Sequence, residues 1–127
     1  TNPCQPPFAV LGAFSPAVAE LLAHAASGLG MTRAFVVHGA PGWDEPTPCG
    51  PFLCFDVRDG RVTRLERDPQ DVGIARYAPE ALQGGDAAHN AEALARVLRN
   101  EVRDAHREII TNRRFFFCCT NRWQKLC

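Results

Sequence analysis

The sequence predicts an α/β fold in which helices flank a central sheet, and three observations support this prediction. A capped, amphipathic helix is expected over residues 16–28, and the apolar, β-branched run at residues 34–37 follows it as a buried strand would. Two further strand-like runs flank the dipeptide Asp59-Gly60, a strong hairpin signal. A second capped helix is expected over residues 87–99. Helix, strand, hairpin and helix in this order are typical of a layered α/β domain.

Length and composition fit one small domain. The chain has 127 residues, enough for a modest core, and its 14 basic and 14 acidic residues balance. Balanced charge gives the whole molecule no electrostatic footprint for nucleic acid or membrane. No run approaches about 18 apolar residues, so no transmembrane helix is expected. Because the chain begins at Thr1, without an initiator Met or a recognisable leader, we expect a piece of a longer protein.

The first predicted helix follows an irregular lead-in. Residues 1–9 carry three prolines and are expected to form no regular element. Ser15 is a suitable N-cap, and Pro16 then occupies the first helical position, where a missing N–H costs nothing. Gly28 and Gly30 are expected to end the helix. The apolar stripe expected to face the core consists of Val18, Leu21, Leu22, Ala25 and Leu29.

The hairpin is expected at the edge of the sheet. Its strands are predicted at residues 52–58 and 61–66, and the second alternates imperfectly between apolar and polar side chains. Arg61, Arg64 and Arg67 would hinder pairing of this strand with other chains. The alternative role for these arginines is phosphate binding.

The second helix is expected after a connecting region. Pro69 and Pro79 are expected to start short helical turns there, and Gly84-Gly85-Asp86 precedes the helix. We interpret Asp86 as the N-cap. An anion site at this helix N-terminus is the alternative, but the Asp86 carboxylate would repel a phosphate. The predicted apolar side of the helix comprises Ala87, Ala91, Leu94, Val97 and Leu98.

The most informative stretch follows the buried strand. Gly39 and Gly42 allow the backbone to turn sharply, and the turn delivers two adjacent carboxylates, Asp44 and Glu45. Ligands of open α/β sheets bind in the crevice beyond the strand ends. Mg²⁺ is commonly held by one or two carboxylates together with substrate phosphates, so this pair is a candidate Mg²⁺ site. The alternative is a solvated surface turn capped by Asp44.

The cysteines form no recognisable metal or disulfide pattern. No Cys-x-x-Cys pair occurs, and the four histidines are not at zinc-ligand spacing. Cys54 lies in a predicted strand, where a thiol behaves as a small hydrophobic group. We therefore expect reduced thiols. The cysteines are Cys4, Cys49, Cys54, Cys118, Cys119 and Cys127, and the histidines are His24, His38, His89 and His106.

The end of the chain differs from what precedes it. From Arg99 to Cys127 there are seven basic and three acidic residues, and residues 115–117 are three consecutive phenylalanines. This run fits no face of an amphipathic helix. A basic, aromatic segment can bind nucleic acid through stacking and phosphate contacts. The alternative is an end unrelated to the preceding domain.

An ordered set of motifs resembles the C-terminal part of anthranilate phosphoribosyltransferases. It comprises Thr1-Asn2-Pro3, residues 10–15 before the first helix, His-Gly-x-x-Gly-x-Asp-Glu at residues 38–45, Leu-Gln-Gly-Gly-Asp at residues 82–86, and Asn90-Ala91. The resemblance covers residues 1–112. It implies part of a phosphoribosyltransferase-type α/β domain, a fold shared with nucleoside phosphorylases, although the Asp-Glu turn argues against a phosphorylase. Residues 113–127 would be an atypical basic and aromatic tail.

The resemblance also implies a reaction. These enzymes are glycosyltransferases of tryptophan biosynthesis, in which the nitrogen of anthranilate attacks C1 of phosphoribosyl pyrophosphate and pyrophosphate leaves. By the same resemblance Asp44 and Glu45 are the Mg²⁺ ligands, and His38 shapes the turn. His38 as a general base is the less favoured alternative. No residue of this chain is assigned as catalytic, and the resembled enzymes are cytoplasmic homodimers.

Other parts of the family's site are not found in this sequence. The Gly-x-Gly-Gly-Asp loop that holds pyrophosphate does not occur in these 127 residues. The residues that hold anthranilate and the dimerising helical domain are also missing, so we expect the chain alone to be inactive. Trp43 and Pro46 depart from the family pattern around the acid pair. The alternative function is a non-catalytic, phosphoribosyltransferase-like protein that binds nucleic acid.

Overall fold

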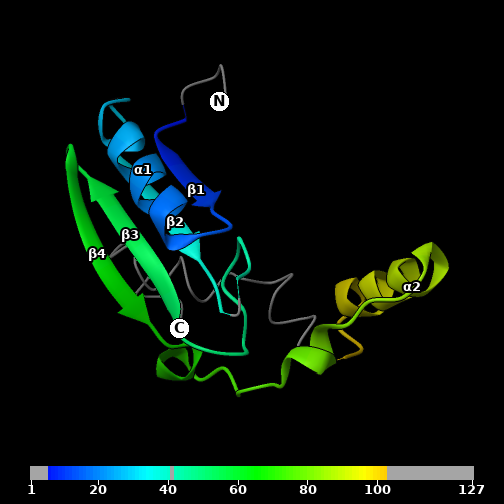
Figure 1. Cartoon of the computed structure of the whole chain (residues 1–127). Coiled ribbons are helices and arrows are strands. Elements are labelled where there is room, and N and C mark those ends of the chain that lie inside the picture. The colour runs from blue at the N-terminus through cyan, green and yellow to red at the C-terminus, as the bar shows by residue number, and fades with distance from the viewer. Residues whose placement is uncertain (1–5, 41, 103–127) are drawn as a thin grey trace.

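The computed structural model describes residues 6–40 and 42–102 of the chain. Four strands and two α-helices are present in this part, together with two short 3₁₀ helices, η1 and η2 (Figure 1). In chain order the elements are β1 (Phe8–Gly12), α1 (Pro16–Ser27), β2 (Arg33–His38), β3 (Phe52–Arg58), β4 (Arg61–Arg67), η1 (Pro69–Val72), η2 (Pro79–Leu82) and α2 (Ala87–Leu98).

The strands form one mixed sheet in the order β1-β2-β3-β4. β1 runs parallel to β2, with Val10 opposite Phe35, whereas β2, β3 and β4 are antiparallel neighbours. The parallel pair is connected through α1, which is the βαβ arrangement of α/β proteins. The predicted α/β class is therefore confirmed. The C-terminal ends of β1 and β2 lie at the same edge of the sheet.

The prediction of an irregular lead-in over residues 1–9 is wrong for Phe8 and Ala9, which belong to β1. The run Phe-Ala-Val-Leu is short, and it is held in strand form by pairing with β2, a long-range contact that local periodicity does not reveal. Side chains along β1 alternate between more and less exposed positions. Leu11 packs with the core under α1, whereas Val10 is 50% exposed on the opposite side.

Helix α1 begins where predicted but buries a different stripe. The Ser15 hydroxyl accepts a hydrogen bond from the Val18 amide at 3.3 Å, which confirms the N-cap. Leu21, expected in the core, is 69% exposed, and Leu29 is 58% exposed. Three alanines face the sheet instead, with Val18 and Leu22 packed beside them: Ala19, Ala23 and Ala26. Small side chains let the helix lie close to the strands, which decides the buried side.

The sheet separates two apolar clusters. The cluster under α1 contains Ala34, Val36, Phe55 and Val57 in addition to the helix alanines. The cluster on the opposite face contains Phe35, Val37, Phe52, Cys54 and Ile74. As predicted, Cys54 is buried among apolar groups.

The hairpin and the connecting region agree with the predictions. Asp59 and Gly60 both have positive φ, at 51° and 73°, as the favoured two-residue hairpin turn requires. β4 is an edge strand of this sheet, and its Arg61, Arg64 and Arg67 are exposed. The two 3₁₀ helices begin at Pro69 and Pro79, as expected.

Helix α2 has the predicted cap but little of the predicted burial. The Asp86 carboxylate accepts a hydrogen bond from the His89 amide at 2.8 Å. The helix extends away from the sheet (Figure 1), so Leu94 stays 44% exposed and Leu98 72% exposed, while Val97 is buried. The predictions for residues 113–127 lie outside the described residues. Within the part of the chain that the structure describes, no helix is long and apolar enough to cross a membrane.

Candidate functional site

The turn that carries the acid pair begins at the end of β2. The Gly39 amide donates a hydrogen bond to the Trp43 carbonyl at 2.7 Å, and the Trp43 amide donates one back to the Gly39 carbonyl at 3.0 Å. Gly42 has a φ of +112°, which side-chain-bearing residues rarely adopt. The sharp turn expected from the two glycines is therefore present.

This acid turn lies across the ends of both parallel strands. A Cβ atom at Gly12, the last residue of β1, would overlap the backbone carbonyl oxygen of Asp44. A Cβ atom at Gly39 would likewise overlap the carbonyl oxygen of Glu45. The backbone of the acid pair thus rests directly on two glycines, one from each strand end. Ligands of open α/β sheets bind at this edge, beyond the carboxyl ends of parallel strands.

The segment after the acid pair is buried and tied to the turn. Pro46, Thr47 and Pro48 are fully buried. The Thr47 hydroxyl donates a hydrogen bond to the Ala40 carbonyl at 2.7 Å and accepts one from the Cys49 amide at 3.4 Å. The two arms of the loop are thereby joined on either side of the carboxylates. Burial of this segment contrasts with the exposed backbone of an ordinary surface loop.

Arg76 and Tyr77, in the segment after β4, form hydrogen bonds with the loop that carries the acid pair. The Arg76 guanidinium donates to the Cys49 carbonyl at 3.3 Å and forms an ion pair with Asp68 at 2.6 Å. The Tyr77 amide donates to the Pro48 carbonyl at 3.0 Å. The region after β4 therefore supports the far arm of the acid loop.

No basic side chain in the part of the chain that the structure describes pairs with the acid pair. Asp44 is exposed and Glu45 partly exposed. Burial raises the pKa of the Glu45 carboxyl above its ordinary value, and the neighbouring Asp44 charge raises it further. Among the described residues, no Lys, Arg or His forms an ion pair with either carboxylate within 4.0 Å. The ion pairs of this part of the chain are Arg33–Asp56, Arg58–Asp59, Arg76–Asp68, Arg99–Glu92 and Arg99–Glu101.

The donor set suits a partly hydrated hard cation. Two adjacent carboxylates supply hard oxygen ligands, as Mg²⁺ requires, and Mg²⁺ keeps several waters or phosphate oxygens in its shell. No group of three or more His, Cys, Asp or Glu side chains around one point is found in the described residues. The two carboxylates therefore fit a cation whose remaining ligands come from water or from a bound molecule.

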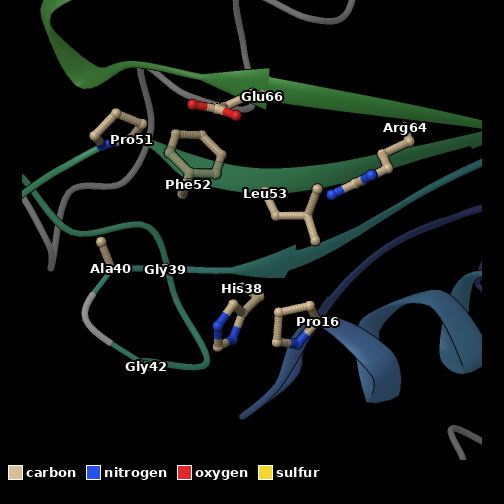
Figure 2. Close-up of a pocket in the computed structure, with 10 residues that line it drawn as sticks. All are labelled: Pro16, His38, Gly39, Ala40, Gly42, Pro51, Phe52, Leu53, Arg64 and Glu66. Atoms are coloured by element: carbon tan, nitrogen blue, oxygen red, sulfur yellow. The ribbon is translucent and has the colours of Figure 1, made fainter.

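His38 faces a cavity beside the turn. Its Nδ1 lies 2.8 Å from the Ala13 carbonyl oxygen, so the ring joins the ends of β1 and β2. Figure 2 shows the ring next to Pro16, beside the turn that runs through Gly39, Ala40 and Gly42. The cavity of about 520 Å³ is also lined by Arg64 and Glu66. This hydrogen bond links the two strand ends, and the turn-shaping role of His38 stays a prediction.

Sequence reasoning missed the residues that support the acid pair. Gly12 acts on Asp44, which is distant in sequence, and Thr47 acts on Ala40 and Cys49 within its own loop through hydrogen bonds that follow no standard turn motif. The only available signal for Thr47 was its place between two prolines, a pattern typical of an irregular, constrained segment.

Comparisons with known proteins identify the family of this chain. Residues 1–126 match the family described as "Glycosyl transferase family, a/b domain". The chain is 46% identical over 110 residues to the anthranilate phosphoribosyltransferase of Solibacter usitatus, which covers 87% of this chain and 32% of that protein. The corresponding enzyme of Rubrobacter xylanophilus is 44% identical over 110 residues, with the same coverage of 87% and 32%.

Solved structures give the same result. The anthranilate phosphoribosyltransferase of Thermus thermophilus superposes with a TM-score of 0.68 and 33% identity, over 79% of this chain and 29% of that one. The enzyme of Saccharomyces cerevisiae, solved in complex with PRPP and Mg, gives a TM-score of 0.75 at 21% identity, over 88% of this chain and 32% of that one. The second likeness supports the fold alone.

The chain spans about a third of the length of the curated relatives that it matches. Over that length it carries the acid turn and the Gly-Gly-Asp segment that caps the second helix, two of the motifs on which the resemblance was based. The match to the family covers nearly all of the 127 residues. The chain therefore belongs to the glycosyl transferase family with this a/b domain, and within it resembles the anthranilate phosphoribosyltransferases.

Proposed function

We propose that this chain supplies the Mg²⁺-binding acid pair of an enzyme that transfers phosphoribosyl from phosphoribosyl pyrophosphate to anthranilate, in tryptophan biosynthesis. The observation that supports this proposal most strongly is the position of Asp44 and Glu45. They lie on a turn across the C-terminal ends of two parallel strands, with no basic side chain of the described residues within ion-pair distance.

The two carboxylates would bind a cation and would not transfer protons. In this reaction a bound Mg²⁺ would neutralise the charge that develops on the departing pyrophosphate. Asp44 and Glu45 would hold and orient the cation, and the glycines beneath them would keep the turn close to the strand ends. His38 would keep its local hydrogen bond to Ala13 and would not act as a general base.

The remaining parts of the site are proposed to come from the length of the relatives that this chain does not span. These parts are the pyrophosphate-holding glycine-rich loop, the anthranilate contacts and the dimerising helical domain. The complete protein would be a cytoplasmic homodimer that binds phosphoribosyl pyrophosphate and anthranilate. The alternative, a non-catalytic nucleic-acid-binding relative, rests on residues 113–127, which lie outside the described part of the chain.

A chimera tests the proposal. The segment of the Solibacter usitatus enzyme that matches this chain is replaced by residues 1–112, and the loss of anthranilate fluorescence is followed after phosphoribosyl pyrophosphate and Mg²⁺ are added. We expect turnover, and we expect Asp44→Asn combined with Glu45→Gln to raise the Mg²⁺ concentration that half-maximal activity requires. Unchanged Mg²⁺ dependence in a folded double variant would remove the metal assignment.

The chain alone is expected to show no phosphoribosyl transfer in the same assay, because it lacks the loop that holds pyrophosphate. Mg²⁺ should still bind, with a dissociation constant of roughly 1 mM or weaker, since only two carboxylates and no substrate phosphate are present. The change of Trp43 fluorescence during a Mg²⁺ titration, in a Trp123→Phe background, measures this binding. Steady turnover above a control without protein would show that the site is more complete than proposed.

A further inference from the structure

We propose that Gly12 and Thr47 are positioning residues for the acid pair, fixing the backbone that carries Asp44 and Glu45. This inference rests on the proposed function of the pair as cation ligands. Neither residue bears a group that would touch the cation. Both act through the loop between Gly39 and Gly50, called the acid loop below.

Gly12 acts by leaving room. Its φ is not among the positive values, so the glycine is not needed for an unusual backbone conformation. It is needed because the Asp44 carbonyl oxygen occupies the space of a Cβ atom at this position, and that oxygen belongs to backbone, which cannot swing aside as a flexible side chain can. The end of β1 thereby sets how far the first carboxylate stands from the sheet.

Thr47 acts by closing the loop. Its side chain is fully buried, and the hydroxyl joins the Ala40 carbonyl, before the acid pair, to the Cys49 amide, after it. Breaking this link would leave the Ala40 carbonyl without the donor that Thr47 provides, and a buried polar group that loses its partner is costly. The fully buried Pro46 and Pro48 stiffen the same arm of the loop.

Fixing this backbone matters because the two carboxylates repel each other. Without restraint the turn would open and separate them, and a cation would have to bring them together again at a cost in conformational entropy. A loop whose backbone is already fixed avoids this cost. Residues that orient metal ligands typically change metal affinity about 10- to 100-fold when they are substituted.

The test compares two variants with matched controls. Gly12→Ala places a methyl group against the Asp44 carbonyl. Gly28→Ala makes the same chemical change where the new Cβ would lie 3.6 Å from its nearest neighbour, an ordinary contact. Thr47→Val removes the hydroxyl at nearly constant shape, and Thr47→Ser retains it.

Each variant is titrated with Mg²⁺ and followed by Trp43 fluorescence in a Trp123→Phe background, and its thermal midpoint is measured without metal. We expect Gly12→Ala and Thr47→Val to bind Mg²⁺ about tenfold more weakly, with Gly28→Ala and Thr47→Ser close to the parent chain. Hydrogen exchange of the Trp43 amide should become faster in the first two variants only.

The outcomes separate this inference from the proposed function. If Asp44→Asn with Glu45→Gln abolishes Mg²⁺ binding while Gly12→Ala and Thr47→Val keep the parental affinity, the positioning role is wrong and the metal site remains. If the double acid variant keeps the parental affinity, the proposed function itself fails. Where Gly12→Ala does not fold, the pair Thr47→Val and Thr47→Ser decides. A lower thermal midpoint with unchanged affinity in Thr47→Val would show a purely structural role.

Discussion

Helices α1 and α2 each contain 12 residues and each begins at a side-chain N-cap, yet their surroundings differ completely. α1 lies on the sheet and buries three alanines, whereas α2 extends away from it and buries Val97 alone. A cap is a contact between residues three apart, so it fixes where a helix begins wherever the helix lies. Which side of the helix is buried depends on a partner distant in the sequence.

The acid loop beside the sheet and the turn before α2 differ in the same way as the two helices. The acid loop is held by contacts distant in sequence, at Gly12 and Arg76. The turn before α2 is held locally, because the Asn90 side chain accepts from the Gly85 amide at 2.9 Å and donates to the Gly85 carbonyl at 3.0 Å. The first loop should therefore lose its shape only when the sheet unfolds, and the second whenever α2 frays.

The largest expected difference in the free energy of unfolding is between a Phe substitution at a buried alanine of α1 and one at an exposed alanine of α2. Ala23→Phe forces a ring between α1 and the sheet, where Ala23 is fully buried. We expect the free energy of unfolding to fall by about 2–3 kcal/mol, because overpacking displaces the helix. Ala91→Phe on the exposed side of α2 should change it by less than about 0.5 kcal/mol. Urea unfolding followed by Trp43 fluorescence, in the Trp123→Phe background, measures both.

Comparable losses from the two variants would contradict the contrast between the helices, since they would show that α2 is also packed against a partner. Ala23→Ser, which hardly changes volume, serves as a control for the chemistry of the substitution. A small effect of Ala23→Phe would mean that α1 does not lie as close to the strands as its alanines indicate.

The same contrast explains how much the sequence predicted. Caps at Ser15 and Asp86 and the turn at Asp59-Gly60 were predicted because each depends on neighbours within three residues. Strand β1 was missed, and the buried stripe of α1 was misassigned, because both depend on contacts with β2 and β3. At the site, periodicity and glycines located the acid turn. Its support at Gly12 is a tertiary contact, which one sequence does not reveal, and the hydrogen bonds of Thr47 lie within the loop but belong to no recognised turn motif.

An intermediate effect is expected when the two caps are removed. Ser15→Ala should lower the free energy of global unfolding by about 1 kcal/mol, because α1 folds together with the sheet. Asp86→Ala removes an equivalent hydrogen bond, but it should act on α2 alone. Amide exchange in α2 should then become faster while the urea midpoint seen by Trp43 stays unchanged. A shift of that midpoint by Asp86→Ala would show that α2 and the sheet unfold as one unit.

The smallest expected effect is a difference in pH dependence between the two regions. Burial, with a contribution from Asp44, raises the pKa of Glu45, so the folded state binds its proton more tightly than the unfolded state. Stability should therefore fall as the pH rises from the ordinary glutamate value of 4.5 through the raised pKa. The pKa of Glu101 shifts in the opposite direction, because the hydrogen bond and charge of Arg99 lower it. The contribution of Glu101 to stability is therefore present above pH 4.5 and is lost as the pH falls through the lowered pKa.

The two glutamates should report through different measurements, because they belong to regions of different stability. Glu45→Gln should flatten the decline of the urea midpoint with rising pH, since Glu45 lies in the acid loop that unfolds with the sheet. Glu101→Gln should leave that midpoint unchanged at every pH and alter only the exchange of amides in α2. Glu101 is exposed and Glu45 partly exposed, so solvent screening keeps either effect small. If Glu45→Gln left the pH profile unaltered, the acid pair would be as well solvated as an ordinary surface turn, and the case for a cation site there would weaken.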